Sequence, residues 1–246
     1  MPPPPRGSGA AGHSRHRAPH EGGWTKEQAK AVLDDPARYS TENPRKLWKR
    51  AGLVRGMCVV DVGAGSGFFT FPASDLVGDS GRVYAVDISR ELVEMIRERA
   101  AVERRGNIEA ALSEPKRVPL PDSIADRVLF ANVLHHVPPA TVREAVRVLR
   151  PGGCLVDLDF RKESTPYGPP LAMRLSATAA RRMLERAGLR TVAEWRPGPS
   201  HYVLMLRKDP ISAHRKARRP GRSAARPRRR TVGARRPSEP GPRRPG

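Results

Sequence analysis

The chain has 246 residues and a net charge of +21, with 38% apolar residues, 26 prolines and two cysteines. Cys58 and Cys154 are too few for a disulfide framework or a zinc site. No run of about 18 apolar residues is present to cross a membrane, and the N-terminus lacks the apolar segment of a secretory signal. We therefore expect a cytoplasmic protein.

Most of the basic charge lies at the two ends of the chain. Residues 1–23 show no apolar periodicity, and residues 207–246 carry 15 lysines and arginines against two acids, a net charge of +13. Such segments cannot bury enough apolar surface to form a core. We predict a disordered head (1–23), one folded domain (24–206) and a disordered Arg/Pro-rich basic tail (207–246).

Two helical stretches open the predicted domain: Trp24–Asp34, with Thr25 as its N-cap, and the less regular Pro36–Gly52, which Pro44 interrupts. We expect them to cover the sheet edge or a cleft. From Gly56 onward, short apolar runs alternate with amphipathic stretches. The predicted strands are Met57–Val62, Arg82–Asp87, Ile108–Leu112, Asp126–Val133 and Cys154–Phe160, and the predicted helices between them are Phe68–Leu76, Arg90–Arg105 and Pro139–Leu149.

The C-terminal third adds a helix at Ala177–Ala187 and two strands, TVAEWR and SHYVLMLR. Only the three residues PGP separate these strands, so they are expected to pair antiparallel. The alternation before them indicates a parallel sheet with helices on both faces, which makes the fold class α/β.

A glycine-rich turn follows the first strand, in VVDVGAGSGFFT (Val59–Thr70). In an open α/β sheet, ligands bind at the carboxyl ends of the strands. A dinucleotide-binding loop would have its last glycine where Phe68 stands, and a P-loop would need a Lys-Ser/Thr pair. Neither phosphate-binding interpretation is favoured.

Two acids narrow the choice of ligand. Asp87 ends the second strand, where a carboxylate can accept hydrogen bonds from both hydroxyls of a ribose. That feature also suits NAD. Asp61 lies two residues before the glycines, where a carboxylate would repel a pyrophosphate but tolerate a cationic ligand.

VVDVGAGSGFFT resembles the first motif of the class I S-adenosylmethionine-dependent methyltransferases, and VYAVDIS resembles their second-strand motif. The resemblance continues through LSEPKRVPLPDSIADRVLFANVLHHV and LRPGGCLVDLDF, over roughly Trp48 to Phe160. YGPPLAMRLS and GPSHYVLML are similar to a small ubiquinone/menaquinone-biosynthesis-type subgroup. The resemblance implies a Rossmann-like, seven-stranded, mostly parallel sheet with an antiparallel last strand, and S-adenosyl-L-methionine as cofactor.

The resemblance also implies a role for each residue of the cofactor site. The glycine turn and the acid before it would shape the pocket for the methionine part, Asp87 would bind the ribose, and Ile88 would lie against the adenine. Glu114 would meet the adenine amino group, and Asn132 the amino-acid end. The implied cofactor-binding set is Asp61, Gly63, Ala64, Gly65, Gly67, Asp87, Ile88, Glu114 and Asn132.

Methyl transfer from a sulfonium mainly requires alignment of the acceptor and exclusion of water. A general base helps only where the acceptor carries a proton. His135 and His136 follow the fourth strand; His135 is a catalytic candidate and His136 a substrate contact, although either could cap a helix or pack under Pro138. We expect Asp157 and Asp159 to point to opposite faces of the sheet, with Asp159 as the second catalytic candidate.

The proline-stiffened loop Arg161–Arg174 is expected to roof the substrate side, with Tyr167 and Arg174 as substrate contacts or, alternatively, as loop packing and a solvated charge. His201 is a remote third candidate. No metal site is expected. The histidines of the head, His13, His16 and His20, are only loosely spaced.

Three functions remain open from the sequence. The first is methylation of a small molecule, for which the subgroup resemblance favours a quinone-type or other aromatic acceptor. The second is methylation of nucleic acid or protein with the tail as docking arm, but ANVLHHV stands where amino-methylating enzymes have N/D-P-P-Y/F. The third is a non-catalytic scaffold. In each case the tail would attract polyanions weakly through its charge.

Overall fold

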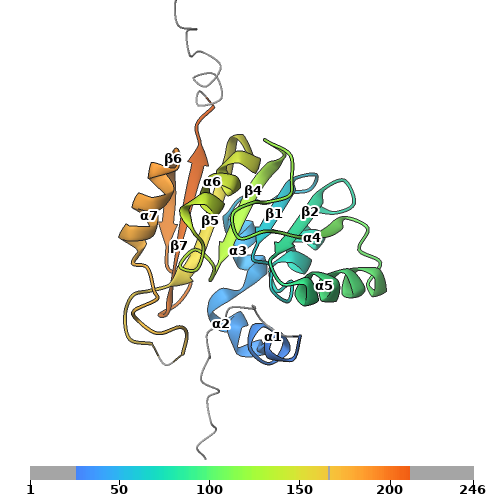
Figure 1. Cartoon of the computed structure of the whole chain (residues 1–246), viewed down its shortest axis with the longest axis horizontal. Helices are drawn as coiled ribbons and strands as arrows, with labels where there is room; N and C mark the ends of the chain where they lie inside the picture. Colours follow the sequence, from blue (N-terminus) through green and yellow to red (C-terminus); the bar gives the residue numbers. More distant parts are fainter. Residues whose placement is uncertain (1–25, 166, 211–246) are drawn as a thin grey trace, which may run out of the picture.

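The computed structural model describes residues 26–165 and 167–210. Seven strands form a sheet of order β3-β2-β1-β4-β5-β7-β6 (Figure 1). Neighbouring strands are parallel except where β7 pairs antiparallel with β5 and with β6. The strands are β1 (Cys58–Val62), β2 (Arg82–Asp87), β3 (Ile108–Leu112), β4 (Ala125–Ala131), β5 (Leu149–Phe160), β6 (Leu189–Trp195) and β7 (His201–Lys208). The predicted Rossmann-like α/β fold is confirmed.

The helices also appear in the predicted order. They are α1 (Lys26–Leu33), η1 (Pro36–Arg38), α2 (Tyr39–Glu42), α3 (Pro44–Arg50), α4 (Thr70–Val77), α5 (Arg90–Val102), α6 (Pro139–Val148) and α7 (Ala177–Arg186). Pro44 is the first residue of α3, and the Asn43 side chain caps that helix by accepting a hydrogen bond from the Lys46 N–H at 3.0 Å. Strand β5 begins at Leu149 rather than at the predicted Cys154, because Leu149 pairs with Ala125 of β4.

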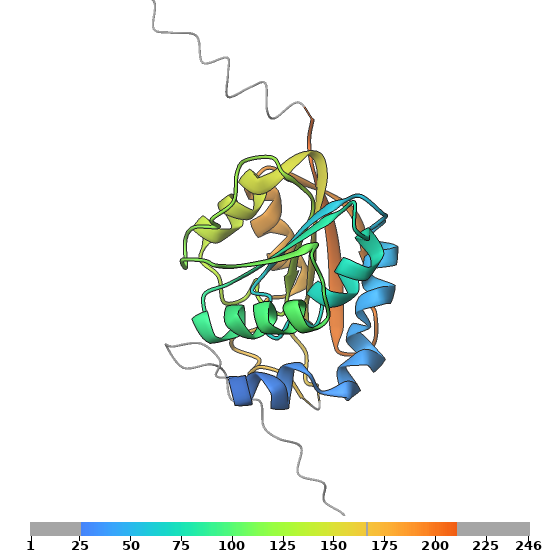
Figure 2. The same cartoon turned by 90° about the vertical axis from the view of Figure 1, so that its right-hand side faces the viewer.

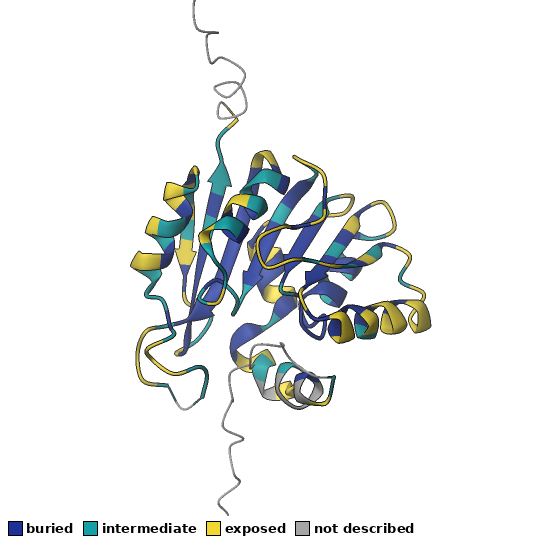
Figure 3. Ribbon diagram, viewed as in Figure 1, coloured by how far each residue is buried: buried dark blue, intermediate teal, exposed yellow. Residues whose placement is uncertain are grey.

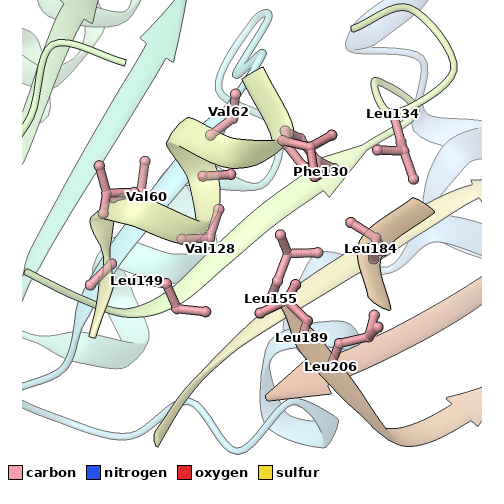
Figure 4. Close-up of a cluster of buried hydrophobic side chains, with 14 of the residues drawn as sticks. Val60, Val62, Val128, Phe130, Leu134, Leu149, Leu155, Leu184, Leu189 and Leu206 are labelled. Carbon is pink, nitrogen blue, oxygen red and sulfur yellow. The ribbon is translucent and has the colours of Figure 1, made fainter. Parts of the chain in front are cut away.

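The two faces of the sheet bury different helices. Alternate residues such as Val60, Val128 and Leu155 face α6 and α7 (Figure 4), whereas Val59 and Val156 face α3 and α4. Helix α5 packs with α4 on that second face. Burial of each such aliphatic side chain contributes about 1.5–3 kcal/mol. The central strands are buried and the outer helix surfaces exposed (Figure 3).

The parallel strands all end at one edge of the sheet, and α1 and α2 lie at that edge (Figures 1 and 2). We call residues 26–42 the N-terminal cap. Strand β7 runs the other way, so the described chain leaves the sheet at the opposite edge, after Lys208. Thr25 and most of the predicted head and tail lie outside the described residues. Among the described residues, no helix is long and apolar enough to cross a membrane.

Candidate active site

A cavity of about 300 Å³ lies at the edge where the parallel strands end. Its wall is built from the segments that follow β1, β2, β3 and β4, from the end of β5, and from the loop that leads to α7. The N-terminal cap closes it through Leu33, Arg38 and Glu42. The predicted residues on this wall are Gly63, Gly65, Asp87, Ile88, Glu114, Asn132, His135, His136 and Tyr167.

The glycine turn forms the floor of the cavity. Gly63 and Gly65 have φ of 72° and 58°, a left-handed conformation that favours glycine. A Cβ atom on Gly63 would stand 2.6 Å from Cγ2 of Val133, and one on Gly65 would stand 2.8 Å from Cδ1 of Leu33. The turn is fixed by the N–H of Gly63, which donates to the Val86 carbonyl at 2.8 Å. The backbone of the turn is therefore bare toward the cavity.

Asp87 closes one end of the wall. Its two carboxylate oxygens accept the N–H groups of Gly65 and Ser89, each at 2.9 Å. Burial raises the pKa of Asp87, and these hydrogen bonds oppose the rise. The next residue, Ile88, leaves 57% of its surface exposed, so a flat apolar surface stands beside a carboxylate that is held in place by the backbone.

His135 and Asp159 form a buried pair at the other end. Nδ1 of His135 lies 2.7 Å from Oδ2 of Asp159, with side-chain exposures of 2% and 0%. The ring of His136 lies against that of His135, with centroids 4.0 Å apart. Burial and the neighbouring His135 lower the pKa of His136, so its ring is neutral at neutral pH.

Glu42 of α2 is a buried carboxylate that the sequence interpretation missed. It pairs with Arg38 at 2.8 Å and accepts the Asn132 side-chain N–H at 2.7 Å. Burial acts to raise the pKa of Glu42, but Arg38 and, more weakly, His201 and Asn132 outweigh it and hold the pKa below its usual range. The spacing of Arg38 and Glu42 on one helical turn was the available signal; nothing local indicated that they face the cavity.

A methyltransferase-domain family model matches residues 60–157. The ubiquinone/menaquinone biosynthesis C-methyltransferase UbiE of Enterobacter sp. is 35% identical over 54% of this chain and 55% of its own length. UbiE of Azotobacter vinelandii is 30% identical over 65% of this chain and 69% of its own length. A SAM-dependent methyltransferase structure from Aquifex aeolicus matches with a TM-score of 0.71 and 33% identity, over 74% of this chain and 98% of that one.

The chain belongs to the S-adenosylmethionine-dependent methyltransferase family. This confirms the predicted family and, with it, S-adenosylmethionine as the cofactor of this methyltransferase. The match spans about half the length of the first curated relative.

The cavity wall fits this cofactor. A carboxylate stands at the end of β2 for a diol, an exposed isoleucine side chain for a flat ring, and a glycine floor where added Cβ atoms would clash. At the other side of the floor, Asn132 has a φ of 58°. Its side-chain oxygen is buried and has no hydrogen-bond partner among the described residues. A buried acceptor of this kind calls for a donor from a ligand.

Three predicted cofactor residues lie behind the wall instead of on it. Asp61 accepts the Thr70 hydroxyl at 2.7 Å, beneath the glycine turn; strand alternation directs it toward α4, together with Val59. Ala64 packs with α5, and the Cα of Gly67 faces the ring of Phe71. These residues shape the methyltransferase turn from below.

The expectation that Asp157 and Asp159 point to opposite faces is wrong. Side chains alternate along a strand, so residues two apart share a face. Burial and the charge of Asp159 together raise the pKa of Asp157 well above its usual range. Asp159 itself does not reach the wall and acts on the cavity only through His135.

The roof over the acceptor side uses its predicted residues differently. Tyr167 lines the cavity, and its hydroxyl lies 3.2 Å from the Thr41 hydroxyl and 3.1 Å from that of Ser200. Arg174 is 4% exposed and donates to loop carbonyls, including that of Pro169 at 2.7 Å, so it clasps the loop and is absent from the wall.

His201 is also buried behind the wall, with its ring centroid 4.0 Å from that of Phe160. Its Nδ1 lies 2.9 Å from the Ser200 hydroxyl, and its Nε2 lies 3.7 Å from Oε1 of Glu42. Among the described residues, no group of three His, Cys, Asp or Glu side chains is arranged to hold a metal ion; His13, His16 and His20 lie outside the described residues.

Proposed function

We propose that this protein methylates a small-molecule acceptor, with a quinone-type or related aromatic ring favoured. The observation that carries the proposal is the continuity of one cavity, from Asp87 and the glycine floor to the histidine pair. The names of the curated relatives support a quinone-type ring. The chemistry that the cofactor supplies is a methyl group on a sulfonium, whose carbon–sulfur bond breaks with both electrons left on sulfur as the acceptor bonds to carbon.

The residues of the first half of the wall would hold the cofactor. We assign the ribose hydroxyls to Asp87, one face of the adenine to Ile88 and the adenine amino group to Glu114. The free side-chain oxygen of Asn132 suits the ammonium of the methionine part, since an amide oxygen is an acceptor and that group is a donor. The bare backbone at Gly65 gives the methionine chain room to approach.

The second half of the wall would hold the acceptor. It is mainly apolar, with Val137, Pro138, Phe160 and Pro169 around the histidines. Such a lining binds a ring by excluding water, and a few polar groups then fix its orientation. Exclusion of water also protects the sulfonium from hydrolysis while the acceptor is aligned.

Calorimetric titration with S-adenosylmethionine and S-adenosylhomocysteine tests the cofactor half. Asp87→Ala removes two hydrogen bonds to a charged acceptor, worth roughly 1.5–3 kcal/mol each, so affinity should fall about 100-fold or more. Asp79→Ala, an exposed acid before β2, is the matched control and should bind normally. Binding of NAD in place of the sulfur ligands would overturn the proposal.

The acceptor half is tested by transfer of labelled methyl to demethylated hydroquinones, to RNA and to a protein lysate. We expect the label in the hydroquinone. Label found only in RNA or protein would reject the small-molecule proposal while leaving the cofactor assignment intact.

A further inference from the structure

We propose that His135 accepts a proton from the acceptor, which is therefore a ring compound with an ionisable hydroxyl and no other anionic group. Asp159 is the positioning residue that gives His135 this role. The inference rests on the proposed function and names the substrate class of the same site.

The hydrogen bonds of Asp159 set the tautomer of His135. Oδ1 of Asp159 accepts the backbone N–H of Phe160 at 2.7 Å, and Oδ2 lies 2.7 Å from Nδ1 of His135. A carboxylate that accepts on both oxygens is ionised and cannot donate. The ring proton of His135 is therefore on Nδ1, and Nε2 carries the lone pair.

Nε2 of His135 is the group left for the acceptor. It is buried and has no hydrogen-bond partner within residues 26–165 and 167–210, although His135 belongs to the cavity wall. A buried acceptor atom without a partner costs about 1–3 kcal/mol. A hydroxyl of a bound ring would remove that cost, which an aprotic acceptor cannot do.

The surroundings leave Asp159 as the anion next to His135. Asp157, on the same face of β5, holds its proton because burial and the neighbouring charge of Asp159 oppose its ionisation. Tyr202 of β7 lies opposite Asp159, and burial together with these two acids raises its pKa, so it too stays neutral. His136 is neutral as well. An imidazolium formed at His135 would thus be stabilised by one adjacent carboxylate.

The described cationic side chains near the cavity have no capacity for a substrate anion. Arg38 donates to both oxygens of Glu42, at 3.2 and 2.8 Å, and to the Leu33 carbonyl. The guanidinium of Arg174 is bound by four loop carbonyls. A carboxylate or phosphate on the acceptor would therefore be desolvated without a partner, which is unfavourable.

The proton step balances as follows. The O–H bond of the acceptor breaks, its proton passes to Nε2, and its electron pair stays on the acceptor, directly on oxygen or delocalised to a ring carbon, to form the bond to the methyl group. If the new bond is to carbon, the displaced ring hydrogen leaves as a proton and restores the hydroxyl. One proton in total is released to solvent from His135.

The first experiment reads the tautomer without any turnover. In ¹⁵N-histidine spectra of the full chain, with His135 assigned from its loss in His135→Gln, we expect protonated Nδ1 and unprotonated Nε2. In Asp159→Asn the amide oxygen retains the Phe160 N–H and its NH₂ group faces Nδ1, so the proton should move to Nε2. Protonated Nε2 in the unsubstituted protein would overturn the proposal.

The second experiment uses substituted hydroquinones of graded hydroxyl acidity. A general base contributes about 10²–10⁴-fold, so His135→Gln should lower kcat by about 100-fold or more for the least acidic ring and progressively less as acidity rises. His136→Gln should lower kcat by one factor throughout the series. A ring carboxylate should raise KM at least about tenfold in the unsubstituted protein.

The outcomes separate the two proposals. If His135→Gln binds S-adenosylhomocysteine normally and shows an acidity-independent loss, or none, His135 is not the base and the methyltransferase proposal stands. If the unsubstituted protein neither binds the cofactor nor transfers methyl to any ring, the proposed function itself fails.

Discussion

Asp61 illustrates, at the scale of single residues, what it costs to build the glycine turn. Burial raises its pKa from 3.8 to about 7, and the hydrogen bond from Thr70 only partly opposes this rise. The folded state therefore holds the Asp61 proton more tightly than the unfolded state. The stability that this group contributes is fully present below pH 4 and is lost as the pH rises to 7.

Asp61→Asn should remove this pH dependence, because an amide still accepts the Thr70 hydroxyl and carries no charge. Relative to the unsubstituted protein, the variant should gain on the order of 3–4 kcal/mol of unfolding free energy between pH 4 and pH 8. Urea unfolding at both pH values measures the difference. A constant difference across this range would contradict a raised pKa for Asp61.

Residue identities were more predictable than residue placements. The motif singled out Asp61, Ala64 and Gly67, but whether a side chain faces the ligand or the helix beneath depends on where the strand ends in three dimensions. The same limit applies to Arg174, whose partners are loop carbonyls that no spacing rule identifies. Asp157 and Asp159 are a different case, because the period of two along a strand was sufficient to place them on one face.

At the scale of elements, the roof of the cavity is a joint between segments far apart in the sequence. The hydroxyl of Tyr167 lies between that of Thr41 in α2 and that of Ser200 before β7. The N-terminal cap and the loop before α7 are therefore tied together over the cavity.

Tyr167→Phe should loosen this joint without unfolding the protein. Each lost hydrogen bond is worth about 0.5–1.5 kcal/mol, so S-adenosylhomocysteine should bind roughly 3–10-fold more weakly, mainly through faster dissociation. Stopped-flow release of the ligand measures this rate. Thr191→Val, which removes a surface hydroxyl bonded to Glu185, is the control. An unchanged rate in Tyr167→Phe would mean that the roof does not govern release.

The order of strands and helices followed from the sequence because each element carries its own apolar period. The contacts of the N-terminal cap did not follow, since Glu42 meets Asn132 across 90 residues and neither residue's local pattern refers to the other. The cap was expected to cover a sheet edge or a cleft; that it adds a charged pair to the cavity wall emerges only from the packed structure.

At the scale of the whole molecule, charge and cavity are separated. Strand β7 starts at His201, opposite the end of β5, and runs away from the cavity to Lys208. The segment that carries most of the net charge, residues 207–246 with +13, therefore leaves the sheet at the edge remote from the cavity.

Removal of residues 211–246 should accordingly separate two properties of the protein. Retention on a polyanion such as heparin should weaken strongly, with a smaller dependence on salt, because fewer charges remain to release counterions. Methylation of a small ring should keep its kcat/KM within about twofold, since no described part of the wall is lost and steering by charge matters little for a neutral acceptor. A truncated chain that binds S-adenosylhomocysteine normally but loses turnover would show that the tail recruits the acceptor, which would favour a polyanionic substrate over a free ring.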